Sequence, residues 1–223
     1  MIPFINIHTH RATDSNSIGI RNLMNPDTME EDLQKEGHYS IGIHPWHIHP
    51  DHWREDLELV SKLASHPRVL AIGEAGLDRL TDLPMDLQQE VFSSMAQLSE
   101  TAGKPLIIHA VRTHSEIAIM HNLLKPQQPW ILHGFNSRQT IAKGLADKGI
   151  LLSFGKALFR GDQPAAGVLK SLKEGQFFLE TDEAEESISS IYQRAVEIRE
   201  TSKEELTNQL FTSFNHLFRH GQS

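Results

Sequence analysis

A chain of 223 residues is long enough to form one domain with a full hydrophobic core, and we expect a single domain over residues 1–223. It contains no cysteine, which excludes a disulfide framework and thiolate metal sites and leaves nitrogen and oxygen donors for any metal ion. The formal net charge is −8 with histidine neutral, and the 21 Lys and Arg residues are dispersed, which argues against a broad basic face that coats nucleic acid. A local site where bound metals supply positive charge stays open.

The apolar runs of the chain give no sign of a membrane or of secretion. The first residues, MIPFINIHTHR, lack a basic segment followed by a long apolar core, so we expect no secretory signal. No apolar run approaches the roughly 20 residues that a membrane span requires. No apolar stretch demands a partner either. We therefore expect a cytoplasmic monomer that makes no contact with a membrane.

Eight short apolar runs rich in Ile, Leu and Phe recur along the chain, as is typical of strands that are buried on both faces. In chain order, the predicted strands are Ile2–Ile7, Ile18–Leu23, Tyr39–Ile43, Val69–Gly73, Leu106–His109, Trp130–His133, Ile150–Ser153 and Phe177–Glu180.

Polar segments that can form helices separate these runs. The predicted helices are Asp51–Ser65, Met85–Ala102, Arg138–Lys148, Glu185–Glu200 and Lys203–Arg219. Gly103 and Gly149 follow the second and third of them, where glycine commonly ends a helix. Thr201-Ser202 before the last resembles the start of a capping box. Only Pro26–Glu36 is available between the second and third strands, so we expect that helix to be a single turn or missing.

Alternating strands and helices predict an α/β fold with a mostly parallel sheet. Eight strands favour a closed (β/α)₈ TIM barrel over an open, doubly wound sheet. Such barrels usually take about 250 residues, so a barrel of this length requires compact loops. No G-x-G-x-x-G or P-loop motif follows the first strand, which removes the usual nucleotide-binding interpretations.

Residues of metal-binding type stand at the ends of these apolar runs. They are His8, His10, Glu74, His109, His133 and Asp182. Parallel strands that close into a barrel bring side chains from the same end of each strand to one point. A divalent ion requires several nitrogen and oxygen ligands that converge in this way. The pattern therefore predicts a metal-dependent barrel hydrolase.

Each of these residues has a plainer interpretation when taken alone. A His-x-His pair such as His8 and His10 is common by chance, although residues i and i+2 of a strand do point to the same face. Glu74 could be a strand-end acid in a salt bridge, and His109 and His133 could be satisfied core residues. Their occurrence together at equivalent strand ends favours metal ligands over these alternatives.

Seven short motifs occur in a fixed order between residue 5 and about residue 182. They are H-T-H, G-I-H-P-W, G-E-A-G-L-D, P-L-I-I-H, I-L-H-G-F, L-S-F-G and L-E-T-D. In this order they resemble the TatD family of metal-dependent hydrolases, for which GEAGLD, the HGF block and LETD are specific. The resemblance implies a (β/α)₈ barrel and divalent-metal hydrolysis of phosphodiesters, notably exonuclease action on DNA.

The resemblance also implies roles for individual residues. One ion would be bound by His8, His10, Glu74 and Asp182, and a second by Glu74, His109 and His133. Asp182 would also be the general base, and Glu74 is counted with it as catalytic because it bridges the ions. Asp78 would support the ligands. The mixed donors allow Mg²⁺, Mn²⁺, Zn²⁺ or Ni²⁺, bound as one ion or two.

Other positions bear on the substrate. His44 would lie at the mouth of the site, and Trp46 and Arg112 could stack on a base or contact a phosphate, although packing at the barrel rim explains Trp46 equally well. The chain departs from the family pattern at Asn6, where aspartate is usual, and at Arg11. Arg112 itself lies one residue later than the family's arginine.

Three functions are therefore compatible with the sequence. The first is a phosphodiester hydrolase with DNase or 3′-exonuclease character that uses metal-activated water. The second keeps the metal site but cleaves a small-molecule ester, amide or phosphomonoester, since a fold does not fix the substrate. The third, which the complete set of predicted ligands disfavours, is a non-catalytic metal-binding barrel.

Overall fold

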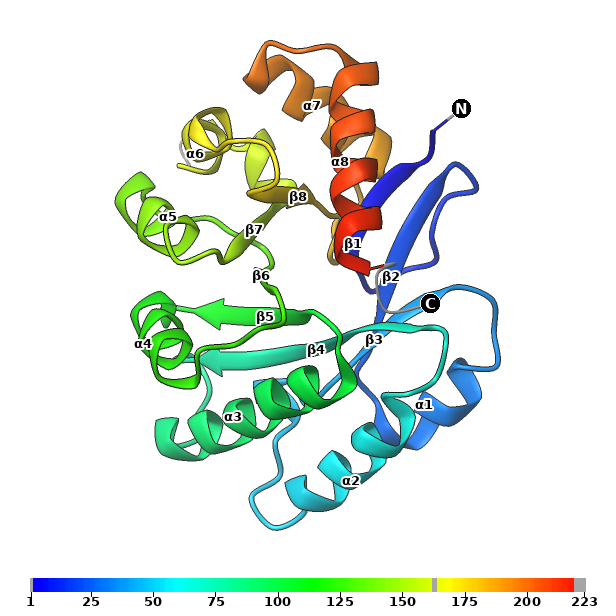
Figure 1. The fold of residues 1–223 in the computed structure, drawn as a ribbon, viewed down its shortest axis with the longest axis vertical. Coiled ribbons are helices and arrows are strands. Elements are labelled where there is room, and N and C mark those ends of the chain that lie inside the picture. Colours follow the sequence, from blue (N-terminus) through cyan, green and yellow to red (C-terminus); the bar gives the residue numbers. More distant parts are fainter. Residues whose placement is uncertain (1, 162–163, 219–223) are drawn as a thin grey trace. The chain divides into compact units, whose positions relative to one another are not determined.

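A computed structural model describes residues 2–161 and 164–218 of the chain (Figure 1). The chain divides into two compact units. The first unit is Met1–Arg21 together with Ile131–Ser223, and the second unit is Asn22–Trp130. From the second strand to the eighth, helices separate the strands as the sequence predicts, whereas the first two strands follow each other directly. The prediction of a single domain over the whole chain stays a prediction.

The strands of the first unit pair in parallel. They are β1 (Phe4–Thr9), β2 (Ser17–Leu23), β6 (Trp130–Leu132), β7 (Leu151–Phe154) and β8 (Phe177–Leu179). β1 pairs with β2, β6 with β7, and β7 with β8. β1 begins and ends two residues later than predicted, and because of the later end it includes His8.

The second unit is built around one long strand. Its strands are β3 (His38–Ile41), β4 (Val69–Asp78) and β5 (Leu106–Val111). β3 and β5 both pair in parallel with β4. The prediction that this strand stops at Gly73 is wrong, because β4 runs on through Glu74 to Asp78 with all of its residues buried. Gly76 permits this, since a Cβ there would lie 1.9 Å from the carbonyl oxygen of His109 on β5.

Helices connect the strands in both units. They are α1 (Pro26–Asp32), η1 (Pro45–His47), α2 (Trp53–Leu63), α3 (Met85–Ala102), α4 (His114–Leu124), α5 (Gln139–Ala146), η2 (Lys156–Phe159), α6 (Ala165–Ser171), α7 (Ile188–Arg199) and α8 (Lys203–Phe218). The five helices predicted with bounds are found. α3 has the predicted bounds and ends at Gly103, which is left-handed at φ 63°. α8 begins as predicted, with the Ser202 hydroxyl accepting from the N–H of Glu205 at 3.1 Å. Its predicted last residue, Arg219, lies outside the described residues.

Three helices differ from the prediction. α1 has seven residues and is longer than a single turn. α4 was not predicted, because Ile119 and Leu123 are exposed and its apolar residues do not follow one face. α6 was not predicted either, since seven residues that include Gly167 are too few to show a helical period.

The hydrophobic core lies against the strands. Ile5 and Ile7 of β1 and Ile72 of β4 are at most 1% exposed. In the first unit α7 and α8 pack against β1, and in the second unit α3 packs against β4. Among the described residues, no helix is long and apolar enough to cross a membrane.

Candidate metal centres

Three side chains of metal-binding type meet at the end of β1 in the first unit. His8 and His10 are two residues apart, so their imidazoles share a face. Asp182 follows β8, and its backbone joins the end of β1: its N–H donates to the carbonyl of His8 at 3.0 Å, and the N–H of His10 donates to its carbonyl at 3.2 Å. This pairing places Oδ1 of Asp182 3.7 Å from Nε2 of His8 and 3.4 Å from Nε2 of His10.

The spacing of these donor atoms suits a shared ion. One donor atom from each of the three residues lies within 4.8 Å of the others. The two nitrogen–oxygen distances are longer than a good N–H···O hydrogen bond. Two ligands bound at about 2.0–2.1 Å to a tetrahedral ion lie roughly 3.3 Å apart, close to what is observed here. Two imidazoles and a carboxylate therefore fit a divalent ion in this cluster.

Asn6 fixes the backbone beside the cluster. Its amide nitrogen donates to the hydroxyl of Thr181 at 2.8 Å, and its amide oxygen accepts from the N–H of Thr181 at 3.0 Å. The Thr181 hydroxyl in turn donates to that of Thr9 at 2.9 Å. Thr181 and Thr9 are the chain neighbours of Asp182 and of the two histidines. The residue that departs from the family pattern thus holds the ligand-bearing segments together.

His133 lies beside this cluster, just after β6. Its ring centroid is 4.3 Å from that of His8, and its Nδ1 is 3.7 Å from Oε1 of Glu180. Glu180 is fully buried, and its Oε1 accepts from the N–H of Gly134 at 2.6 Å. A carboxylate next to one ring nitrogen commonly orients a histidine that binds metal through the other nitrogen. Glu180 is in a position to orient His133 in this way.

A pocket of about 150 Å³ opens at the same cluster. Asp182 and Glu180 line it together with two basic residues, Lys156 and Arg160. Nζ of Lys156 is 3.8 Å from Oδ2 of Asp182, whereas the distances of 3.7 and 3.4 Å to the two imidazoles are those of Oδ1. The pocket thus joins a metal-type carboxylate to side chains that can bind an anion. Neither basic residue was predicted from the sequence.

A second group of donors lies in the second unit. It consists of His44, which follows β3, Glu74 on β4 and His109 on β5, with donor atoms within 4.8 Å of one another. Oε1 of Glu74 is 2.8 Å from Nδ1 of His109 and 3.3 Å from Nε2 of His44. All three side chains are buried. Two imidazoles and a carboxylate are thus held here, as in the first unit.

Asn22 holds the carboxylate of this second group. Its amide oxygen accepts from the N–H of Glu74 at 2.9 Å and from the hydroxyl of Ser40 at 3.1 Å. Its amide nitrogen donates to Oε2 of Glu74 at 3.3 Å, which leaves Oε1 facing the imidazoles. Asn22 was not predicted as a site residue, because its position in the sequence gives no sign of this role.

Asp78 fixes the orientation of His109. It lies four residues after Glu74 on β4 and therefore on the same face. Its Oδ2 is 3.1 Å from Nε2 of His109 and accepts from the indole N–H of Trp46 at 2.7 Å. With Nε2 donating to this carboxylate, Nδ1 of His109 is the nitrogen left to bind a metal. Gln88 secures the backbone of Asp78 by accepting from its N–H and donating to its carbonyl.

Two pKa shifts favour metal binding at the second group, one in its ligand His44 and one in Asp78, which orients His109. Burial acts to raise the pKa of Asp78, but hydrogen bonds from the N–H of Leu80, from Trp46 and from His109 outweigh it and hold the pKa below its usual value. Burial lowers the pKa of His44, against the opposing effect of Glu74. An ionised carboxylate and a neutral imidazole are the forms that such a centre requires.

The residues predicted to contact substrate differ in placement. His44 is 4% exposed and belongs to the donor group around Glu74. Trp46 is 62% exposed, with its indole N–H bound to Asp78 and its ring edge-on to His44 at 5.0 Å. Arg112 is exposed and left-handed at φ 56°. The exposed faces of Trp46 and Arg112 leave both able to contact a ligand.

Comparison with known proteins identifies related sequences. The family described as TatD related DNase matches residues 16–219, a range that begins after the His8-Thr9-His10 block. The uncharacterized metal-dependent hydrolase YabD of Bacillus subtilis (strain 168) is 32% identical over 146 residues, which are 64% of this chain and 57% of that protein. The uncharacterized metal-dependent hydrolase TatD of Mycobacterium tuberculosis (strain ATCC 25618 / H37Rv) is 30% identical over 152 residues, which are 64% of this chain and 56% of that protein. The chain thus spans a little over half the length of these curated relatives.

Comparison with solved structures identifies the fold. The crystal structure of YJJV, a TatD homologue from Escherichia coli K12, covers 98% of this chain and 99% of its own, with a TM-score of 0.86 and 20% sequence identity. The crystal structure of a TatD family hydrolase from Entamoeba histolytica covers 97% of this chain and 98% of its own, with a TM-score of 0.79 and 15% sequence identity. This likeness shows that the chain has the (β/α)₈ barrel fold predicted from its sequence.

Proposed function

Because the chain belongs to the TatD related DNase family, we propose that it is a divalent-metal-dependent hydrolase that cleaves phosphodiester bonds in DNA. The names of the curated relatives, metal-dependent hydrolases, support the reaction class. The description of the family supports DNA as the substrate.

The observation that carries the proposal is the convergence of His8, His10 and Asp182. Their donor atoms are spaced for one ion, and the pocket beside Asp182 carries Lys156 and Arg160. A metal-type carboxylate next to two cations is what a phosphodiester requires, because negative charge on the phosphoryl group has to be offset on more than one side. A structural metal site would not need a basic pocket.

A divalent ion held by these residues would polarise a phosphoryl oxygen and offset the charge of the leaving group. Asp182 would act as the general base through Oδ2, the oxygen on the side of Lys156, and take a proton from the attacking water. Lys156 would bind a phosphate oxygen and hold the diester near this carboxylate. Trp46 and Arg112 would contact more distant parts of the substrate by stacking and by charge.

The second donor group would bind an ion of its own. Glu74 would act there as the ligating carboxylate, with His44 and His109 as nitrogen ligands and Asp78 orienting His109. The ligand sets drawn from the family resemblance, which add Glu74 to the first ion and His133 to the second, stay predictions.

The test is metal-dependent cleavage of two substrates, a generic aryl phosphodiester and 3′-labelled single-stranded DNA, with Mg²⁺, Mn²⁺ or Zn²⁺ and with a chelator. We expect cleavage that the chelator abolishes. The variant Asp182→Asn should lose at least about a hundredfold in kcat, because it removes a general base and a ligand at once. The matched control is Asp147→Asn, an exposed carboxylate paired with Lys143, which should keep wild-type activity.

The outcomes separate the candidate functions. Wild-type turnover in Asp182→Asn would contradict the role of this residue. Cleavage of the aryl diester without cleavage of DNA would favour a small-molecule esterase. Stoichiometric metal binding without cleavage of either substrate would reject phosphodiester hydrolysis and direct the search to amides, esters and phosphomonoesters.

A further inference from the structure

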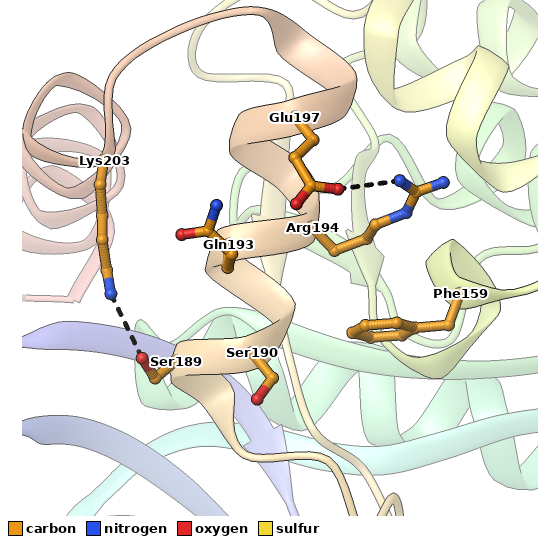
Figure 2. Close-up of a pocket in the computed structure, with 7 residues that line it drawn as sticks. All are labelled: Phe159, Ser189, Ser190, Gln193, Arg194, Glu197 and Lys203. Atoms are coloured by element: carbon orange, nitrogen blue, oxygen red, sulfur yellow. Dashed lines mark hydrogen bonds and ion pairs between the residues drawn. The ribbon is translucent and has the colours of Figure 1, made fainter.

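The short helix η2 separates two pockets of the first unit. Lys156, its first residue, and Arg160, which directly follows it, line the pocket at Asp182. Phe159, its last residue, lines a larger pocket of about 560 Å³ against α7 and the start of α8 (Figure 2). Phe159 and Arg160 are chain neighbours, so their Cα atoms are only about 3.8 Å apart. One step along the chain therefore leads from the smaller pocket to the larger one.

The smaller pocket has the size and charge for a phosphate group. Its volume of about 150 Å³ is too small for a whole nucleotide, and its basic side chains are Lys156 and Arg160. Asp182 and Glu180 contribute carboxylates, and Oδ2 of Asp182 lies 3.8 Å from Nζ of Lys156. An anion that enters it would meet cations from η2.

The larger pocket has the composition of a base-binding site. Figure 2 shows the ring of Phe159 directed toward α7, where Ser189, Ser190 and Gln193 present hydroxyl and amide groups. Phe159 is 42% exposed, so its ring is accessible to a ligand. An aromatic face beside neutral hydrogen-bonding groups suits a nucleobase, which stacks through its flat face and binds through its polar edge. Lys203 at the rim of the pocket adds a cation for the backbone of the strand.

The position of η2 is fixed from both sides. Leu158 is fully buried, and its carbonyl accepts from Nε of Arg194 on α7 at 3.0 Å. Arg194 is held in turn by Glu197 at 3.0 Å, as Figure 2 shows. Phe159 and Arg160 therefore project from an anchored turn, so an ordered contact with a ligand costs little further conformational entropy.

We propose that η2 and Arg160 form the nucleotide-binding element of this protein. Lys156 and Arg160 bind a backbone phosphate beside Asp182, and Phe159 stacks on the adjoining base of a single-stranded DNA. The inference rests on the proposed function, to which it adds the residues that hold the DNA strand. It assigns DNA contacts to residues that neither the motifs nor the predicted ligands include.

The test compares Phe159→Ala with Phe159→Tyr, which keeps an aromatic face. The readout is the ratio of kcat/KM for a short single-stranded oligodeoxynucleotide to kcat/KM for an aryl phosphodiester, which has no base to stack. We expect Phe159→Ala to lower this ratio about tenfold and Phe159→Tyr to keep it, given the usual strength of base–aromatic stacking. Leu123→Ala is the matched control, because Leu123 is an apolar side chain 74% exposed on α4. A ratio that is unchanged in Phe159→Ala, or lowered equally in Phe159→Tyr, would overturn the proposal.

Oligonucleotides with a single abasic nucleotide moved along the strand identify the stacked base. With the abasic nucleotide at one particular position, kcat/KM of the wild type should fall to the value of Phe159→Ala. The two proteins should then cleave this oligonucleotide equally well. Arg160→Gln should reduce the slope of log Kd against log salt concentration by about 0.7, the value of one phosphate contact on a single strand. The nucleotide-binding element would be rejected if the abasic nucleotide equalised the two proteins at no position and if Arg160→Gln left the salt slope unchanged.

Equilibrium binding without turnover distinguishes failure of this inference from failure of the proposed function. A fluorescent single-stranded oligodeoxynucleotide is titrated with each protein in the presence of a chelator, and its anisotropy gives Kd. If wild type cleaves neither substrate but binds the oligonucleotide about tenfold more tightly than Phe159→Ala, hydrolysis is rejected and the DNA-binding element stands. If wild type cleaves the aryl diester but does not bind the oligonucleotide, the hydrolase stands and the element is rejected.

Discussion

At the residue scale, the contacts of Asp78 lead to a test of the second donor group. Its two oxygens accept from three donors, the N–H of Leu80, the indole of Trp46 and the imidazole of His109. An asparagine has one acceptor oxygen and would turn an N–H₂ group toward at least one of these donors. We expect Asp78→Asn to weaken metal binding by about 10- to 100-fold, because it no longer fixes the ring of His109.

Calorimetric titration of the metal-free protein with Zn²⁺ or Mn²⁺ measures this affinity. Asp86→Asn is the matched control, because Asp86 is an exposed aspartate whose carboxylate accepts from the N–H of its neighbour Leu87. Equal affinities in wild type and Asp78→Asn would show that His109 is oriented by other contacts. The same result would remove Asp78 from the metal centre.

The residues that the sequence identified and those that it missed differ in kind. His8, Glu74 and Asp182 each stand at the end of an apolar run, and the recurrence of ionisable side chains at these positions is what predicts them as ligands. Asn22 does not stand out, because one asparagine in a strand reads as an ordinary polar position. Its role depends on the N–H and the carboxylate of Glu74, 52 residues away. Supporting residues of this kind require the fold to be known.

At the element scale, glycine has opposite uses in β4 and in α6. A Cβ on Gly76 would lie 1.9 Å from the backbone of β5, so Gly76→Ala has to push apart the strands that carry Glu74 and His109. We expect it to destabilise the protein by about 1–3 kcal/mol and to weaken metal binding. Gly167 in α6 has no atom within 4 Å of its would-be Cβ. Gly167→Ala should therefore stabilise by about 0.5–1 kcal/mol through helix propensity.

Urea unfolding followed by circular dichroism measures both changes. The pair is informative because the chemical change is identical and the structural context alone differs. Destabilisation of similar size in both variants would show that the approach of β4 to β5 is not the cause. A neutral Gly76→Ala would show that the two strands can separate without cost.

The elements that the sequence predicted are those with a long, regular pattern. α3 has 18 residues with apolar side chains at helical spacing and a glycine at its end, and its bounds were correct. α4 and α6 lack such a pattern, the first because it exposes leucine and isoleucine and the second because it is short. β4 was predicted too short because Gly73 and Gly76 read as turn residues, whereas in the structure both let backbones approach closely.

At the scale of the whole molecule, the net charge predicts less about the substrate than the position of individual charged residues does. The net charge of −8 and the dispersed basic residues argue against a broad basic face, yet they say nothing of a local pair such as Lys156 and Arg160. The order of the motifs predicted the fold, because that order follows the succession of strands. What the motifs could not predict is which polar side chains surround each ligand.

Each unit contains a donor group built from its own strands, so bound metal should stabilise the folded protein. An ion that binds the native state alone contributes about 2.7 kcal/mol at a hundredfold excess over its Kd. For a chain of this length, that free energy raises Tm by about 5–10 °C. We therefore expect a chelator to lower Tm by this amount for each ion that it removes, and Zn²⁺ or Mn²⁺ to restore it. Asp182→Asn and Glu74→Gln should each lose part of the metal-dependent increase.

The two donor groups make a further distinction in the same thermal unfolding experiment. If each holds its own ion, the losses in Asp182→Asn and Glu74→Gln should add in the double variant, because sites without shared ligands act independently. If the two residues bind one ion, either variant should lose as much as both together. His52→Gln is the control for adventitious binding, since His52 stacks on His49 as an exposed pair of imidazoles. A Tm that neither chelator nor metal changes would contradict binding at both groups.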